Sequence, residues 1–237
     1  MRRLRSSCWH DLSYLKSHWQ LLAITALVFA LWHTPVVVPL KILVVFLHEL
    51  SHVVAVWLTS GSVEQISLSP AQGGFAVTRG GSRFSILSAG YIGSLLMGVA
   101  LLLAALRSTA DRYVTALLGA MMLLITVLYV RDLFAIGFCV AAGLVLLGMA
   151  RFLGHAANDL ALRVIGLTSV IYVPFDIFDD TIARAGLPSD AHMLAADFGG
   201  PTILWGGLWL VISVTVILAC LRHIRGSSSN FSLRPRP

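Results

Sequence analysis

The sequence predicts an all-helical polytopic membrane protein with a small β-hairpin inserted between two of its helices. Hydrophobic residues make up 57% of the 237 residues, and charged residues make up only 12%. The mean hydropathy is +0.85. This composition excludes an ordinary soluble protein. The apolar residues also fall into runs of about 20, which is the length that a helix needs to cross a bilayer.

Seven apolar runs are candidates for membrane-spanning helices. The first is short and is followed by Pro35 and Pro39, so it can tilt, end early or re-enter the membrane. Arg131 and Asp132 divide a long apolar stretch into two runs, because charged residues are costly inside a bilayer. We therefore expect six or seven transmembrane helices, drawn from residues 20–34, 36–58, 84–106, 112–130, 132–150, 160–178 and 202–222.

The segment 60–83 differs in kind from these runs. Residues 62–68 alternate polar and apolar side chains, residues 73–78 follow a turn that contains Pro70, and two glycines end the pattern at 80 and 81. Alternation on both sides of a turn predicts a β-hairpin. Because open strand edges in a membrane protein must be buried in protein or face water, we expect the hairpin at the cytoplasmic surface, beside the helix of residues 36–58. An ordinary surface hairpin is the alternative.

The charges separate the ends of the chain from its apolar middle. The net charge is +6, and arginines cluster at both ends, at positions 2, 3, 5, 222, 225, 234 and 236. This distribution favours contact with anionic lipid headgroups and offers no continuous basic face for nucleic acid. We expect a basic cytoplasmic segment over residues 1–19, a membrane domain over 20–222 that contains the hairpin insertion, and a disordered tail over 223–237.

The positive-inside tendency favours a cytoplasmic N-terminus. With seven spans, this orientation places Arg79 and Arg83 inside but leaves the basic C-terminal tail outside. The number of spans and the side of the C-terminus therefore stay open. A cleaved signal peptide is not expected, because a long polar and aromatic stretch precedes the first apolar run.

The second apolar run contains the motif His48-Glu49-Leu50-Ser51-His52. Histidines four residues apart lie one turn apart on the same helix face, where both can bind one metal ion. Glu49 is placed to accept a proton from a water at that metal. Ionisable groups inside a membrane are costly and so indicate function. That cost disfavours the alternative of two core histidines beside an unrelated glutamate.

A catalytic zinc usually has three protein ligands and a water. The other six histidines lie before the first run, beside Pro35, in loops or at the end of the last run. Asp176 lies late in the run 160–178, and a carboxylate is a suitable third ligand. Asp179 and Asp180, one turn further on, are alternatives, as is a solvated helix end without a metal. We expect Asp190 to cap the short helix that follows it.

These residues together resemble the site-2 protease family of intramembrane zinc metallopeptidases. The histidine motif in one span is followed by Ala89-Gly90-Tyr91-Ile92-Gly93-Ser94 in the next and by an aspartate far downstream. The stretch 79–91 and Ser189-Asp190-Ala191 are most similar to the compact bacterial branch, and no loop is long enough for a PDZ-type domain. The resemblance extends from about Val44 to Trp209.

The resemblance implies that His48, His52 and Asp176 bind one zinc ion per chain and that Glu49 is the catalytic acid/base. The usual Asp-Gly of the third-ligand motif is Asp176-Ile177 in this sequence. Gly90 and Ser94 match the G-x-x-x-N/S/G motif, which implies a position beside bound substrate. Close helix packing is the alternative role for these small residues.

The function implied is cleavage of peptide bonds in or next to transmembrane segments of membrane protein substrates, in a bacterial plasma membrane. A substrate held in extended form could pair with a strand edge of the hairpin. Two other classes are a non-hydrolytic metal-binding protein, such as a transporter, and an inactive relative that acts as a binding module. A transporter would need ligands along several spans, and an inactive relative has no use for Glu49.

Overall fold

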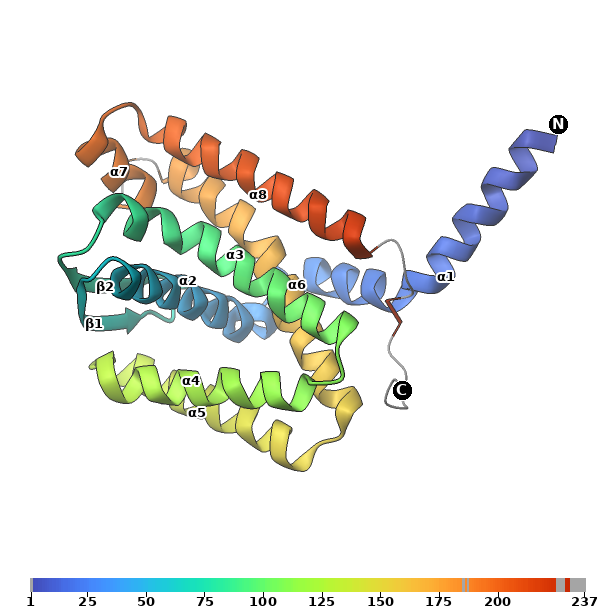
Figure 1. Ribbon diagram of the computed structural model, residues 1–237, viewed down its shortest axis with the longest axis horizontal. Helices are drawn as coiled ribbons and strands as arrows, with labels where there is room; N and C mark the ends of the chain where they lie inside the picture. The colour runs from blue at the N-terminus through green and yellow to red at the C-terminus, as the bar shows by residue number, and fades with distance from the viewer. Residues whose placement is uncertain (1, 185, 187, 225–228, 231–237) are drawn as a thin grey trace.

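The structure is a computed structural model that describes residues 2–184, 186, 188–224 and 229–230, with only the backbone described for residues 2–15 (Figure 1). Helices account for most of the described chain, and the sheet has two strands. In chain order the elements are α1 (Arg2–Ala30), a 3₁₀ turn (Pro35–Val37), α2 (Val38–Leu58), β1 (Ser62–Leu68), β2 (Gly74–Arg79), α3 (Arg83–Arg107), α4 (Asp111–Tyr129), α5 (Leu133–Phe152), α6 (His155–Phe178), a π-helical turn (Asp179–Ala183), α7 (Asp190–Phe198) and α8 (Thr202–Ile224).

Six segments within the described residues are long and apolar enough to cross a membrane. They are Pro35–Leu58, Arg83–Arg107, Asp111–Tyr129, Leu133–Phe152, His155–Ala183 and Thr202–Ile224. The prediction of a polytopic helical protein with a small hairpin is therefore confirmed. The first expected run, 20–34, is not one of the six. Helix α1 instead continues through the expected domain boundary between residues 19 and 20.

The break between α1 and α2 follows from its prolines. The Thr34 hydroxyl donates to the Leu31 carbonyl over 2.7 Å, which closes the end of α1. Pro35 then starts the 3₁₀ turn and Pro39 lies in the first turn of α2, where a proline costs no hydrogen bond. Trp32 packs against Phe175 of α6, with ring centroids 5.6 Å apart. Both α1 and α2 also contact α6.

Helix α2 is the most enclosed of the six candidate spans. Within the described chain, 72% of its most apolar window is buried, against 22% for α8. Glycines allow the neighbouring helices to approach closely. A Cβ atom at Gly93 would lie 2.5 Å from the hydroxyl oxygen of Ser51, and one at Gly98 would lie 2.5 Å from Cβ of Ser169. The polar motif of α2 is thus held inside the bundle by α3 and α6.

The hairpin is antiparallel, with Ser62 opposite Arg79 and Leu68 opposite Gly74. Gly80 and Gly81 follow it with φ values of 71° and 75°, a left-handed conformation that favours glycine. The outer edge of β1 is partly covered, because Ile66 forms a parallel bridge with Val130. The expected hairpin is therefore confirmed, and its second strand leads directly into α3.

The hairpin lies at one end of the bundle, and α1 and the last turns of α8 lie at the other (Figure 1). Near the N-terminus, the Ser17 carbonyl accepts a hydrogen bond of 3.0 Å from the Ser229 amide. With six spans, a cytoplasmic N-terminus and a cytoplasmic hairpin cannot both hold. Of the tail expected at 223–237, residues 223 and 224 belong to α8, whereas 225–228 and 231–237 lie outside the described residues.

Candidate metal centre

Helix α2 presents the two histidines of the motif on one face. The imidazole centroids of His48 and His52 are 4.9 Å apart. His52 and Glu49 are buried, with relative exposures of 6% and 4%, and His48 is partly buried. The i, i+4 spacing therefore brings together two nitrogen donors and a carboxyl group, as the sequence predicts.

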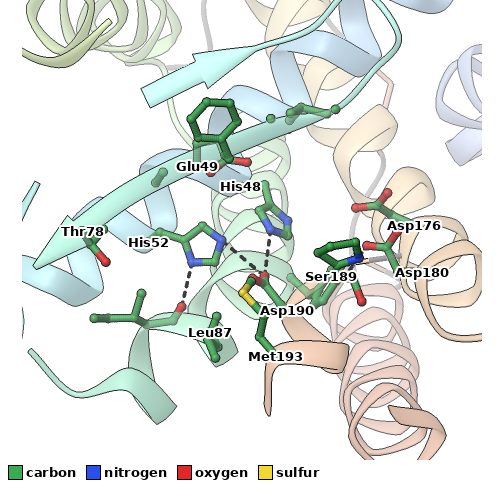
Figure 2. A pocket seen from close by; sticks show the side chains of 18 of the residues that line it. His48, Glu49, His52, Thr78, Leu87, Asp176, Asp180, Ser189, Asp190 and Met193 are labelled. Atoms are coloured by element: carbon green, nitrogen blue, oxygen red, sulfur yellow. Dashed lines mark hydrogen bonds and ion pairs between the residues drawn. The ribbon is translucent and has the colours of Figure 1, made fainter. Parts of the chain in front are cut away.

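A third candidate ligand comes from α7 rather than α6. Oδ2 of Asp190 lies 3.0 Å from Nε2 of His48 and 3.3 Å from Nε2 of His52 (Figure 2). Burial by itself would raise the pKa of Asp190, but the two histidines facing it hold the pKa of this carboxyl well below its usual range. Asp190 is therefore an anionic candidate ligand. Among the described residues, His48, His52 and Asp190 form the one group of three that could hold a metal ion.

The donor set fits zinc. Nδ1 of His52 lies 2.7 Å from the carbonyl oxygen of Ile86, which can only accept a hydrogen bond. Nδ1 must therefore carry the proton, and in the neutral ring the lone pair of Nε2 faces Asp190. Two imidazole nitrogens and one carboxylate oxygen are a known ligand set for catalytic zinc. In addition, Oε2 of Glu49 is buried without a hydrogen-bond partner among the described residues.

The three aspartates predicted around the end of α6 take different positions. Asp176 and Asp180 line the same cavity as the histidines, whereas Asp179 is exposed and does not line it. Asp180 accepts hydrogen bonds from the Tyr91 hydroxyl and, over 2.8 Å, from Nη2 of Arg184. The group that could hold a metal does not include these aspartates. A ligand role for Asp176 therefore stays a prediction, and the geometry favours Asp190.

The expectation that Asp190 caps α7 was wrong. The hydroxyl of Ser189 accepts from the His192 amide over 3.2 Å and is the cap, so Asp190 is the first residue of the helix and its side chain is free to face α2. The similarity of Ser189-Asp190-Ala191 to the bacterial branch was the available signal. Spacing could not identify Asp190 as a candidate ligand, because 142 positions separate it from His48.

These groups surround a cavity of about 400 Å³. Its walls come from α2, the hairpin, α3, the end of α6 and α7 (Figure 2). Residues 72–76 and Thr78 of the hairpin region form one wall, and Asp176, Asp180 and Arg184 form another. The cavity therefore places the candidate metal ligands and Glu49 beside a strand and beside charged groups.

Gly90 and Ser94 have different positions. A Cβ atom at Gly90 would lie 2.5 Å from Oδ2 of Asp190 and closer still to Nε2 of His48, so a side chain there would occupy the metal centre. The fully buried Ser94 hydroxyl donates a hydrogen bond of 2.8 Å to the carbonyl of Gly90, and the Ser169 hydroxyl donates to the Ser94 carbonyl. Ser94 is absent from the cavity wall. These contacts favour packing for Ser94, and substrate binding by either residue stays a prediction.

The start of β2 lies directly over the carboxyl group of α2. A Cβ atom at Gly74 would lie 2.7 Å from Oε1 of Glu49 and 2.9 Å from Cγ1 of Val45. These separations are shorter than normal van der Waals contact, so glycine permits this approach of strand to helix. An extended chain beside β2 would therefore lie close to Glu49.

The bundle of candidate membrane spans therefore encloses a candidate metal centre with two imidazoles and two carboxyl groups. The model of the Peptidase M50B-like family matches residues 21–220. The chain therefore belongs to the Peptidase M50B-like family of zinc metallopeptidases, in agreement with the resemblance to site-2 proteases. No curated protein and no solved structure matches the chain.

The two candidate third ligands can be separated by zinc affinity. Asp190→Ala removes the oxygen that faces both histidines, and we expect it to weaken zinc binding by a factor of about 100 or more. Asp176→Ala should leave the affinity within about threefold of wild type. Zinc titration of the purified proteins against a chelator measures both. The opposite ranking would establish Asp176 as the ligand.

Proposed function

We propose that the protein is an intramembrane zinc endopeptidase that hydrolyses peptide bonds in or next to transmembrane segments of other membrane proteins. The observation that carries the proposal is the buried carboxyl group of Glu49, whose Oε2 has no partner among the described residues, beside three candidate ligands in one cavity. A structural carboxyl group in an apolar bundle needs a partner. A general base, in contrast, has to keep an oxygen free for a water molecule.

Each residue then has a defined task. His48, His52 and Asp190 would hold one zinc ion, which supplies polarisation of the scissile carbonyl and lowers the pKa of a water molecule. Glu49 accepts a proton from the attacking water while the water oxygen bonds to the carbonyl carbon. Glu49 then delivers this proton to the amide nitrogen as the carbon–nitrogen bond breaks. Proton and atoms balance for the hydrolysis of one peptide bond.

Substrate would enter in extended form along β2. Helical substrates hide their backbone carbonyls in hydrogen bonds, so the cleaved segment has to unwind. β1 is bonded to β2 on one side and bridged to Val130 on the other, whereas Phe75, Ala76 and Thr78 of β2 line the cavity. The β2 edge is therefore the better partner for β-augmentation. The contact of Gly74 with Glu49 would keep such a strand near the catalytic carboxyl group.

We further propose that the N-terminus faces the cytoplasm of a bacterial cell and that the cavity lies near the opposite face of the plasma membrane. Arg107, Arg112, Arg151 and Arg222 lie at the helix ends that share the terminal end of the bundle. Arg79, Arg83, Arg131 and Arg184 lie at the hairpin end, and Arg2, Arg3 and Arg5 at the start of α1 give the terminal end its excess of basic residues. The more basic end is the cytoplasmic end by the positive-inside tendency.

Replacement of the catalytic carboxyl group tests the proposed activity. Glu49→Gln should retain zinc and lose cleavage of a membrane protein substrate by a factor of about 100 to 10,000, because the amide cannot accept the proton. The matched control is Glu64→Gln, the only other glutamate, which lies in the hairpin and pairs with Arg79. Cleavage by Glu49→Gln at the wild-type rate, or zinc without cleavage in wild type, would contradict the proposal.

Proline in β2 tests the substrate edge. Val77→Pro and Ala76→Pro remove one backbone donor each from adjacent positions, and adjacent amides of a strand point to opposite edges. We expect the variant that blocks the free edge to reduce cleavage at least tenfold with zinc content unchanged. Val77→Thr keeps the amide and the branched shape and is the control. Unaffected cleavage in both proline variants would exclude β-augmentation at this strand.

Cysteine labelling tests the orientation. Gly73→Cys at the hairpin and Gly154→Cys at the other end both have open space for a side chain. In a Cys8→Ser background, a membrane-impermeant maleimide should label Gly73→Cys in intact spheroplasts and Gly154→Cys only after permeabilisation. The reverse pattern would place the hairpin in the cytoplasm.

A further inference from the structure

Helix α7 carries the candidate ligand Asp190, yet it has only nine residues. A helix this short is not stable alone and takes its position from its neighbours. Its inner face contributes Ala191 and Leu194 to an apolar cluster with Leu87 and Trp209. Apolar contacts of this kind are not directional, so they hold α7 on the bundle without fixing its tilt.

Directional contacts lie at the other end of α7 from Asp190. Nε of Arg83, the first residue of α3, donates to Oδ2 of Asp197 over 2.6 Å. Nη2 of Arg83 also lies 3.6 Å from the sulfur of Met193. Asp197 is seven residues beyond Asp190, so the ion pair acts about 10 Å away along the helix axis. A contact at that distance controls the tilt of α7 and hence the position of Asp190.

An aromatic contact supports the same arrangement. Phe84 lies edge-on to Phe198, the last residue of α7, with ring centroids 5.6 Å apart. Phe84 also contacts Trp205 of α8, whose indole nitrogen donates to the Gly199 carbonyl over 2.9 Å. The first turn of α3 therefore holds the end of α7 by charge and by ring packing.

We propose that Arg83 is a positioning residue that holds α7 so that Asp190 reaches His48 and His52. The inference rests on the proposed metal centre and deepens it. We call the ion pair of Arg83 with Asp197 the clamp. Because Arg83 follows β2 by only four positions, the clamp also connects the proposed substrate strand to the helix that supplies the third ligand. An extended chain bound at β2 and a metal bound at Asp190 would then favour the same position of α7.

The clamp predicts a measurable change in zinc affinity. Loss of the ion pair lowers the fraction of molecules in which α7 is docked, and the apparent affinity falls with that fraction. The side chains of Arg83 and Asp197 are 55% and 37% exposed. Loss of a solvent-exposed ion pair of this kind corresponds to a change of about three- to fivefold in the apparent zinc Kd. We therefore expect Arg83→Ala and Asp197→Ala each to raise the zinc Kd about three- to fivefold.

A charge exchange separates positioning from general helix stability. Arg83→Asp places a negative charge at the start of α3 and Asp197→Arg a positive charge near the end of α7, so each favours its own helix through the dipole. Each single exchange should nevertheless weaken zinc binding, because like charges then face each other. The double variant should return to within about twofold of the wild-type Kd.

The experiment uses the full-length proteins in detergent, with zinc titrated against a chelator and cleavage measured in parallel. Arg79→Ala is the matched control for the zinc titration alone, since Arg79 forms a similarly exposed ion pair with Glu64 in the hairpin. An unchanged Kd in both alanine variants, a double exchange no tighter than the weaker single variant, or lost cleavage at unchanged Kd would overturn the clamp. Zinc binding that is insensitive to His48→Ala would instead overturn the metal centre on which the clamp rests.

Discussion

The contact of one carboxylate with two imidazoles is the interaction on which the rest of the structure depends. Ionisable groups in an apolar bundle are stable only when they compensate one another or bind a metal. Asp190 meets this requirement for His48 and His52 at once, from a different helix. Gly90 makes the contact possible, because a side chain at that position would fill the space between them. The glycine and serine contacts of α2 with α3 serve the same close approach.

The hairpin adds a second constraint to the same place. Its second strand begins against the side chain of Glu49 and ends four residues before Arg83, which contacts α7. One short stretch of chain therefore touches the candidate catalytic base and the helix that carries the candidate third ligand. A fold that brings together strand, base and ligand in this way can couple the presence of an extended chain to the geometry of the metal centre.

Local patterns were sufficient to predict much of this arrangement. Six of the seven apolar runs predicted candidate spans, the alternation after residue 61 predicted the hairpin, and the spacing of His48 and His52 predicted their shared face, because each depends on neighbours in sequence. The position of Asp190 depends instead on how the short helix α7 docks against the start of α3. Asp176 was the predicted ligand because it lies late in an apolar run, but depth in the membrane does not determine whether a carboxyl group reaches the two histidines. The course of α1 likewise depends on packing against α6 around Trp32.

The placement of α1 and the end of α8 at one end of the bundle has a practical consequence. An even number of crossings returns the chain to the side on which it starts, and the hairpin and the cavity lie at the other end (Figure 1). Fluorescent proteins, affinity tags or surface tethers attached at either terminus would thus leave the cavity mouth unobstructed. A reconstituted protein held by such a tether would present all of its cavities to the same compartment, so substrate and metal could be supplied from one side of the bilayer.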